Sequence, residues 1–190
     1  MSLIALQGGA TGTGTVTLLA PVTNTNRTIN LPDSNGTIVT SATAGVPING
    51  PAFSAYLSAN QSIANSTNTK VQCNTEEFDT NSNYDNATNF RFTPTIAGYY
   101  QVSAFATMSA ATTTGQSNIA LYKNGSQFKN GAQVSNGTSG FGMPLSTLIS
   151  MNGSTDYLEI YVFQNTGSSQ NLNGNVSSTY FQAALIRSAV

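Results

Sequence analysis

The chain contains no histidine, no tryptophan and a single cysteine, Cys73, in 190 residues. Histidine is the side chain whose unperturbed pKa lies near 7, so its absence removes the usual carrier of acid–base chemistry at neutral pH. One cysteine excludes a disulfide framework within the chain and, without histidine, a four-ligand structural zinc site. We interpret Cys73 as a small, half-buried hydrophobic residue, with pairing between chains as the alternative. These absences predict a protein that is not an enzyme.

Charge is also scarce. Charged residues make up 7% of the chain, with six basic and seven acidic side chains, whereas about 25% is usual for soluble domains. A net charge of −1 offers no basic stripe for nucleic acid. Exposed β-structure with few charges is prone to edge pairing, so we expect other chains to cover the strand edges. The composition therefore favours an oligomer.

Long hydrophobic runs are missing as well. No apolar stretch approaches the ~20 residues of a membrane-spanning helix, so we expect no membrane insertion. The start, MSLIALQGG, lacks the basic residues and long apolar core of a secretory signal. The sequence thus predicts assembly in a cytoplasm.

The chain divides near residue 50. All eight tyrosines and nine phenylalanines lie between Phe53 and Phe181. Residues 1–50 lack bulky side chains for a core of their own and must borrow one from a partner. We predict that residues 1–50 form an attachment segment and linker, and that residues 51–190 form a head domain. The predicted attachment residues are Leu3, Ile4, Leu6, Val16, Leu18, Leu19, Ile29, Leu31, Ile38 and Val39.

After the linker the pattern is that of short β-strands. Residues 98–106 alternate between large apolar and small or polar side chains, which predicts a half-buried strand. Asn124-Gly125 is the favoured dipeptide of a type I′ hairpin turn. No ten-residue stretch has a helical period. Eight to ten short strands with turns between them predict an all-β sandwich or jelly roll.

Residues 53–187 resemble the C1q-like head, a ten-stranded jelly roll related to the tumour-necrosis-factor (TNF) fold. The resemblance rests on Phe53-Ser54-Ala55-Tyr56-Leu57, Thr69-Lys70-Val71-Gln72, Glu77-Phe78-Asp79, Tyr84-Asp85, Asn89-Phe90-Arg91-Phe92-Thr93-Pro94, Ala97-Gly98-Tyr99-Tyr100-Gln101-Val102-Ser103, Leu121-Tyr122-Lys123-Asn124-Gly125, Asp156-Tyr157-Leu158-Glu159-Ile160-Tyr161-Val162 and Thr179-Tyr180-Phe181-Gln182-Ala183. It implies a homotrimer that buries apolar faces. The residues assigned to the core or the trimer contact are Phe53, Tyr56, Phe90, Phe92, Tyr99, Tyr100, Phe105, Tyr157, Tyr161, Phe163, Tyr180 and Phe181.

The first 40 residues are similar to short β-modules of bacteriophage fibre and minor virion proteins. With the head, this similarity implies a non-enzymatic, homotrimeric protein on the surface of a phage virion, attached to capsid or tail proteins through residues 1–50. The first interpretation is capsid decoration, as a cement protein or short head fibre. The first alternative is the receptor-binding tip of a tail fibre, with a host surface glycan or protein as partner. A cellular C1q-like lectin or adhesin is the second.

Four carboxylates lie close together in the sequence: Glu76, Glu77, Asp79 and Asp85. Hard cations prefer carboxylate and carbonyl oxygens, and some C1q-like heads bind calcium, so these residues are calcium candidates. A solvated strand edge is the alternative we favour, and a glycosidase carboxylate pair is a third reading. We predict no other cofactor. Of Tyr99 and Tyr100, one must point inward in an alternating strand, and the other could stack on a carbohydrate.

Overall fold

The computed structural model describes residues 50–109, 114–135 and 139–189. In these ranges all regular structure is β, which confirms the predicted class, and none of their residues forms a helix that could span a membrane. The attachment residues predicted between Leu3 and Val39 lie outside the described residues. The strands are β1 (Ala52–Tyr56), β2 (Gln61–Ile63), β3 (Thr69–Lys70), β4 (Thr75–Asp79), β5 (Tyr84–Asp85), β6 (Arg91–Phe92), β7 (Gly98–Met108), β8 (Gln116–Lys123), β9 (Ser126–Ser135), β10 (Phe141–Met151), β11 (Leu158–Gln164), β12 (Gln170–Leu172) and β13 (Thr179–Ser188).

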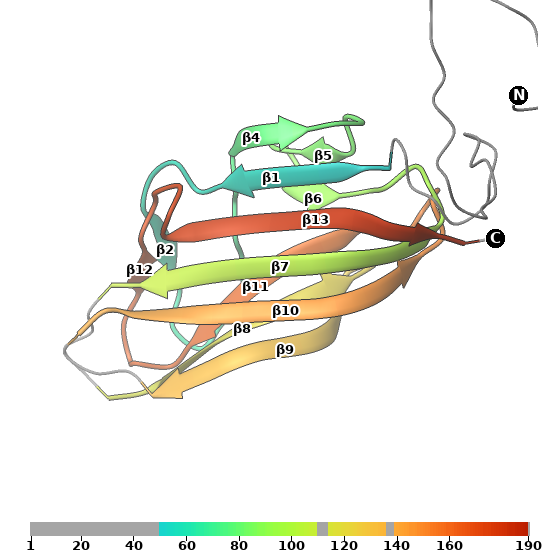
Figure 1. Cartoon of the computed structure of the whole chain (residues 1–190). Helices are drawn as coiled ribbons and strands as arrows, with labels where there is room; N and C mark the ends of the chain where they lie inside the picture. Colours follow the sequence, from blue (N-terminus) through green and yellow to red (C-terminus); the bar gives the residue numbers. More distant parts are fainter. Residues whose placement is uncertain (1–49, 110–113, 136–138, 190) are drawn as a thin grey trace, which may run out of the picture. The chain divides into compact units, whose positions relative to one another are not determined.

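The strands form two antiparallel sheets that face each other (Figure 1). Sheet A has the order β2-β12-β7-β13-β1-β4, and β10 pairs with β7 along its full length. Sheet B has the order β5-β6-β11-β8-β9, and β3 pairs with β11. Strands far apart in sequence lie side by side, as where β13 pairs with both β1 and β7. This arrangement of two sheets with long crossovers is a jelly roll.

A stack of aromatic rings fills the space between the sheets at the β1 end. Phe53 from sheet A stacks on Tyr84 and on Phe92 of sheet B, each with ring centroids 4.6 Å apart. Phe181 meets Phe53 edge to face at 5.0 Å, and Tyr100 meets Phe92 at 5.6 Å. Offset and edge-to-face pairs of this kind add about 0.5–1.5 kcal/mol each beyond the buried area. The alternation predicted for residues 98–106 is confirmed, because Tyr100 is fully buried and Tyr99 is exposed.

The predicted turn at Asn124-Gly125 joins β8 to β9. Both residues have positive φ, 54° and 76°, as a type I′ turn requires. The side chain of Asn124 also ties this turn to the next loop, since its Oδ1 accepts from the Tyr157 N–H and its Nδ2 donates to Asp156. The hairpin prediction is confirmed.

Cys73 lies in the core with no exposed surface. Burial in apolar surroundings raises the pKa of its thiol to about 12, so the thiolate is scarce at neutral pH. A sulfur in this position cannot reach a second chain. The interpretation as a small hydrophobic residue holds, and the alternative of pairing between chains was wrong.

Gly131 marks the place where β9 comes close to β10. A Cβ on this residue would lie 2.7 Å from the Pro144 carbonyl oxygen and 2.8 Å from Leu145 Cβ. Both neighbours are backbone or backbone-proximal atoms, which cannot rotate away. The approach of the two sheet edges therefore requires glycine at this position.

We expect Gly131→Ala to lower the free energy of unfolding by about 2 kcal/mol, because the added methyl group overpacks a rigid contact. Urea unfolding of both proteins at equal chain concentration measures the change. The matched control is Gln133→Ala, an exposed position on the same strand, which should shift stability by less than about 0.5 kcal/mol. Equal stability of the Gly131→Ala protein and the unaltered one would show that β9 and β10 are not in close contact.

Candidate self-association face

The outer face of sheet A is built by alternation along its central strand. In β7 the side chains of Tyr100, Val102 and Ala104 point into the core, so those of Tyr99, Gln101, Ser103, Phe105 and Thr107 point out. The neighbouring strands of sheet A follow the same alternation, because residues directly opposite each other in two paired strands have their side chains on the same face of the sheet. Strands β4, β1, β13, β7 and β10 thus present one continuous surface, which faces the viewer in Figure 1.

The middle of this face is polar, and its side chains are hydrogen-bonded to one another. Gln101 Nε2 donates to Ser146 Oγ at 2.9 Å. Ser54 Oγ donates to a Glu77 carboxylate oxygen at 2.7 Å and lies 3.5 Å from Gln182 Oε1. These bonds fix the side chains in place, so little rotamer freedom remains to be lost when a partner covers them.

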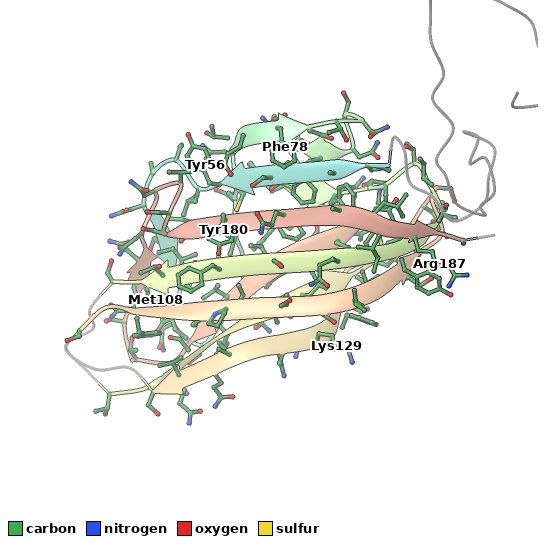
Figure 2. All side chains as sticks on the ribbon, viewed as in Figure 1. Tyr56, Phe78, Met108, Lys129, Tyr180 and Arg187 are labelled. Atoms are coloured by element: carbon green, nitrogen blue, oxygen red, sulfur yellow. The ribbon has the colours of Figure 1, made fainter. Side chains whose placement is uncertain are left out.

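An aromatic group lies on the half of the face nearer the start of β13. Phe105 and Tyr180, directly opposed across β7 and β13, stack at 5.9 Å. Tyr56 is opposed to Tyr180 on the other side of β13. Figure 2 shows Tyr56 and Tyr180 on the strands β1 and β13. All three rings remain partly exposed.

An apolar group lies at the opposite end of the face, near the end of β13. Tyr99, Leu148 and Ile186 are 49%, 57% and 48% exposed, and they line a hollow of about 460 Å³. The register of β13 against β7 shifts between Leu185 and Arg187, so Ile186 lies at a bulge. A bulge turns a side chain out of the regular alternation.

A second, smaller hollow lies between the two groups. It has a volume of about 160 Å³, and Ala52, Ser103 and Ala184 provide small side chains for its lining. Phe78 of β4 stands beside it, 52% exposed (Figure 2). Protruding rings and hollows therefore alternate on the same surface.

The composition of the face separates it from the rest of the surface. Four of the six large hydrophobic side chains that are exposed in the described residues lie here. The outward positions of β7 and β10 carry no charge, and the charged groups at the margins are Glu77 on β4 and Arg187 at the end of β13. Large uncharged apolar surfaces are typical of protein–protein contacts. The face can therefore bind another protein surface.

The twelve aromatic residues predicted for the core or the trimer contact fall into three sets. Phe53, Phe92, Tyr100 and Phe181 are in the core. Tyr56, Tyr99, Phe105 and Tyr180 are on the outer face of sheet A. Phe90, Tyr157, Tyr161 and Phe163 are half-buried elsewhere. Three residues of the face and one of the core were not predicted from the sequence: Phe78, Leu148, Ile186 and Tyr84.

The four calcium candidates do not converge. Glu77 accepts from Ser54 on sheet A, whereas Asp79 accepts from the Tyr84 N–H at 2.7 Å and closes the β4–β5 turn. Asp85 accepts from the backbone N–H groups of Ala87, Thr88 and Asn89, which hold its pKa at about 2. In the described part of the chain no three acidic, cysteine or histidine side chains gather closely enough to hold a metal ion. Glu77, Asp79 and Asp85 thus serve as loop caps or edge groups, and the described structure does not bring Glu76, Glu77, Asp79 and Asp85 together at one point.

No protein-family model and no curated protein sequence matches the chain. Solved structures do. Murine APRIL at pH 5.0 is similar with a TM-score of 0.54 and 9% identity, over 72% of this chain and 98% of that chain. Eiger TNF from S. frugiperda is similar with a TM-score of 0.52 and 7% identity, over 74% and 96%.

A third similar structure is the vertex protein P5 of phage PRD1. Its TM-score is 0.51 with 19% identity, over 73% of this chain and 98% of that chain. At identities this low the similarities establish the fold alone. They confirm the jelly roll of the TNF type that the sequence resemblance implied.

Proposed function

We propose that the chain is a non-enzymatic, homotrimeric surface protein of a bacteriophage virion, most specifically a capsid decoration protein. Its head domain projects from the particle, and residues 1–50 attach it to virion proteins. The observation that carries the proposal is the group of large hydrophobic side chains on the outer face of sheet A, which a lone head would leave in water.

A second copy of the chain is the occupant we assign to this face. The protruding Phe78, Leu148 and Ile186 and the hollows beside them lie on the same surface, so two copies offer each other both shapes. The C1q-like resemblance supports three copies about one axis. A head-to-tail contact that closes after three copies buries the face without leaving an open edge.

The phage setting is supported by two independent features. The TNF-type fold occurs in a vertex protein of phage PRD1, and the first 40 residues are similar to β-modules of phage fibre and minor virion proteins. Together they favour a head carried on a particle. The scarcity of charge on the trimer face agrees with permanent burial in an assembly.

Decoration of the capsid is preferred over the tip of a tail fibre because PRD1 protein P5, which has a similar fold, is a vertex protein. If the chain were instead the tip of a tail fibre, its partner would be a glycan or protein of the host surface. A cellular lectin would bind the same kinds of partner.

Electron microscopy of purified virions, labelled with an antibody against the head, tests the location. We expect label distributed over the capsid. Label confined to the tail would replace decoration by receptor binding, and particles without label would contradict the virion role altogether.

A further inference from the structure

A polar pocket lies at the β5–β6 end of sheet B. It has a volume of about 310 Å³, at the lower end of the size range of small-molecule sites. Its lining comes from β5, β6 and the two loops that flank them, and none of it belongs to the outer face of sheet A. The lining residues are Ser82, Asn83, Tyr84, Asp85, Arg91, Thr93 and Thr95.

Arg91 supplies the positive charge of this pocket. Its guanidinium lies 4.6 Å from the centre of the Tyr157 ring, so the ring supports one face of the group. The ion pairs among the described residues are Lys70–Glu159 and Lys123–Asp156, and neither includes Arg91. The stacked guanidinium is half-buried and keeps donors for a ligand.

The acidic residue of the pocket does not neutralise Arg91. Asp85 is opposite Arg91 in the β5–β6 register, yet its two oxygens accept from Ala87, Thr88 and Asn89 in the following loop. These bonds lower the pKa of Asp85 to about 2, and Arg91 is not among the groups that do so. The carboxylate is committed to the loop, so among the described residues the guanidinium has no carboxylate partner.

Backbone strain gathers at the same place. Ser82 in the lining has φ 52°, and Phe90, directly before Arg91, has φ 49°. A bulky side chain at positive φ is uncommon, and such conformations cost about 1–3 kcal/mol and cluster at ligand sites. Phe90 lies directly before Arg91, so one of the two strained residues adjoins the guanidinium that stacks on Tyr157.

We propose that this pocket binds a sugar residue bearing a carboxylate, of the uronic or sialic acid class. The planar fork of Arg91 matches a carboxylate and can donate two parallel hydrogen bonds to it. The hydroxyl groups of Ser82 and Thr93 are suited to the hydroxyl groups of the same sugar. The pocket is independent of the trimer contact, so this proposal stands or falls separately from the virion role.

Titration of the full-length protein with sodium glucuronate tests the proposal. Binding is measured by calorimetry and by saturation-transfer NMR. We expect millimolar or tighter binding of glucuronate or of N-acetylneuraminate, and at least about tenfold weaker binding of glucose, which has no carboxylate. Arg91→Ala should weaken binding of the acidic sugar at least about tenfold, and Arg91→Lys should weaken it less, because lysine keeps the charge but not the fork.

The matched control is Lys129→Ala, which removes an exposed cation from β9, away from the pocket. It should bind the acidic sugar as the unaltered protein does. Circular dichroism shows whether each variant remains folded. Three outcomes would each overturn the proposal. The first is equal binding of glucuronate and glucose, and the second is unchanged binding in folded Arg91→Ala. The third is no binding of either acidic sugar at 10 mM, which is about the weakest affinity expected of a single charge-assisted contact.

Discussion

A chain carrying both Leu148→Lys and Ile186→Lys is expected to sediment as a folded monomer at micromolar concentrations, where we expect the unaltered chain to be a trimer. Both side chains are about half exposed in the isolated head, so lysine at either position can remain in water without disturbing the core. In the assembly the same ammonium groups would be buried against an apolar surface without a counter-charge.

An unpaired charge buried at a contact costs about 2–5 kcal/mol, and each 1.4 kcal/mol is tenfold in affinity. Two such groups per chain should weaken association at least about 100-fold. Loss of fold is not expected, because neither side chain packs in the core, and a β-rich circular dichroism spectrum checks this.

Phe128→Lys provides the matched control for this prediction. Phe128 is 42% exposed on β9 of sheet B, so it is an equally prominent hydrophobic side chain outside the proposed contact. It should leave the trimer intact. If Phe128→Lys dissociates the assembly and the double variant does not, the contact lies on sheet B and the assignment of the face is wrong.

Gln164→Glu is expected to destabilise the head by about 3–5 kcal/mol at pH 7.5, a large part of the 5–15 kcal/mol typical of a domain. Gln164 is fully buried at the end of β11. Its Nε2 donates to the carbonyl oxygens of Ile63 and Ser168, and its Oε1 accepts from the N–H and hydroxyl of Thr166. A carboxylate would keep the two acceptor contacts but place a second oxygen against two carbonyl oxygens.

The penalty should depend on pH. Burial raises the pKa of the introduced carboxyl in the folded state above its unfolded value of about 4.3. Below pH 4.3 the group is neutral in both states, so the charge adds no penalty. Above it, the penalty grows by about 1.4 kcal/mol per pH unit until the folded-state pKa is reached.

Urea unfolding at pH 4 and pH 7.5, at one fixed chain concentration, measures this difference. Gln72→Glu is the control, since Gln72 is exposed and the new carboxylate would remain in water. It should change stability by less than about 0.5 kcal/mol at both values of pH. An equal loss for Gln164→Glu at pH 4 and pH 7.5 would show that the buried charge is not the source of the cost.

The long strands were predictable because their pattern is local. The alternation around Tyr99 and Tyr100 reflects burial of one face, and Asn124-Gly125 has the positive φ that its residue types favour. The shortest strands were not. β2 and β12 contain three residues each, and they pair with each other although they lie far apart in sequence.

The self-association face was only partly predictable. Alternation shows that one side of a strand differs from the other, but it does not show which aromatic rings enter the core and which remain outside. Ile186 is exposed because β13 has a bulge, and a bulge depends on the pairing with β7. Leu148 shares that face because Leu148 is directly opposite Gln101.

The acidic residues between Glu76 and Asp85 show that closeness in sequence does not predict a shared site. Glu77, Asp79 and Asp85 are close in sequence, yet each is bonded to a different segment of the chain. Proximity along a chain that turns after each short strand does not place side chains in one site. The Arg91 pocket is lined by residues 82–95, and it was missed because its shape depends on the positive φ of Ser82 and Phe90 and on the ring of Tyr157 behind Arg91.

Sedimentation equilibrium of the full-length chain at micromolar concentration tests the central claim most directly. The proposed contact through the outer face of sheet A predicts a single species of three chains. A stable monomer at this concentration would contradict the account, because the exposed group of Tyr99, Leu148 and Ile186 would then have no copy of the chain to cover it.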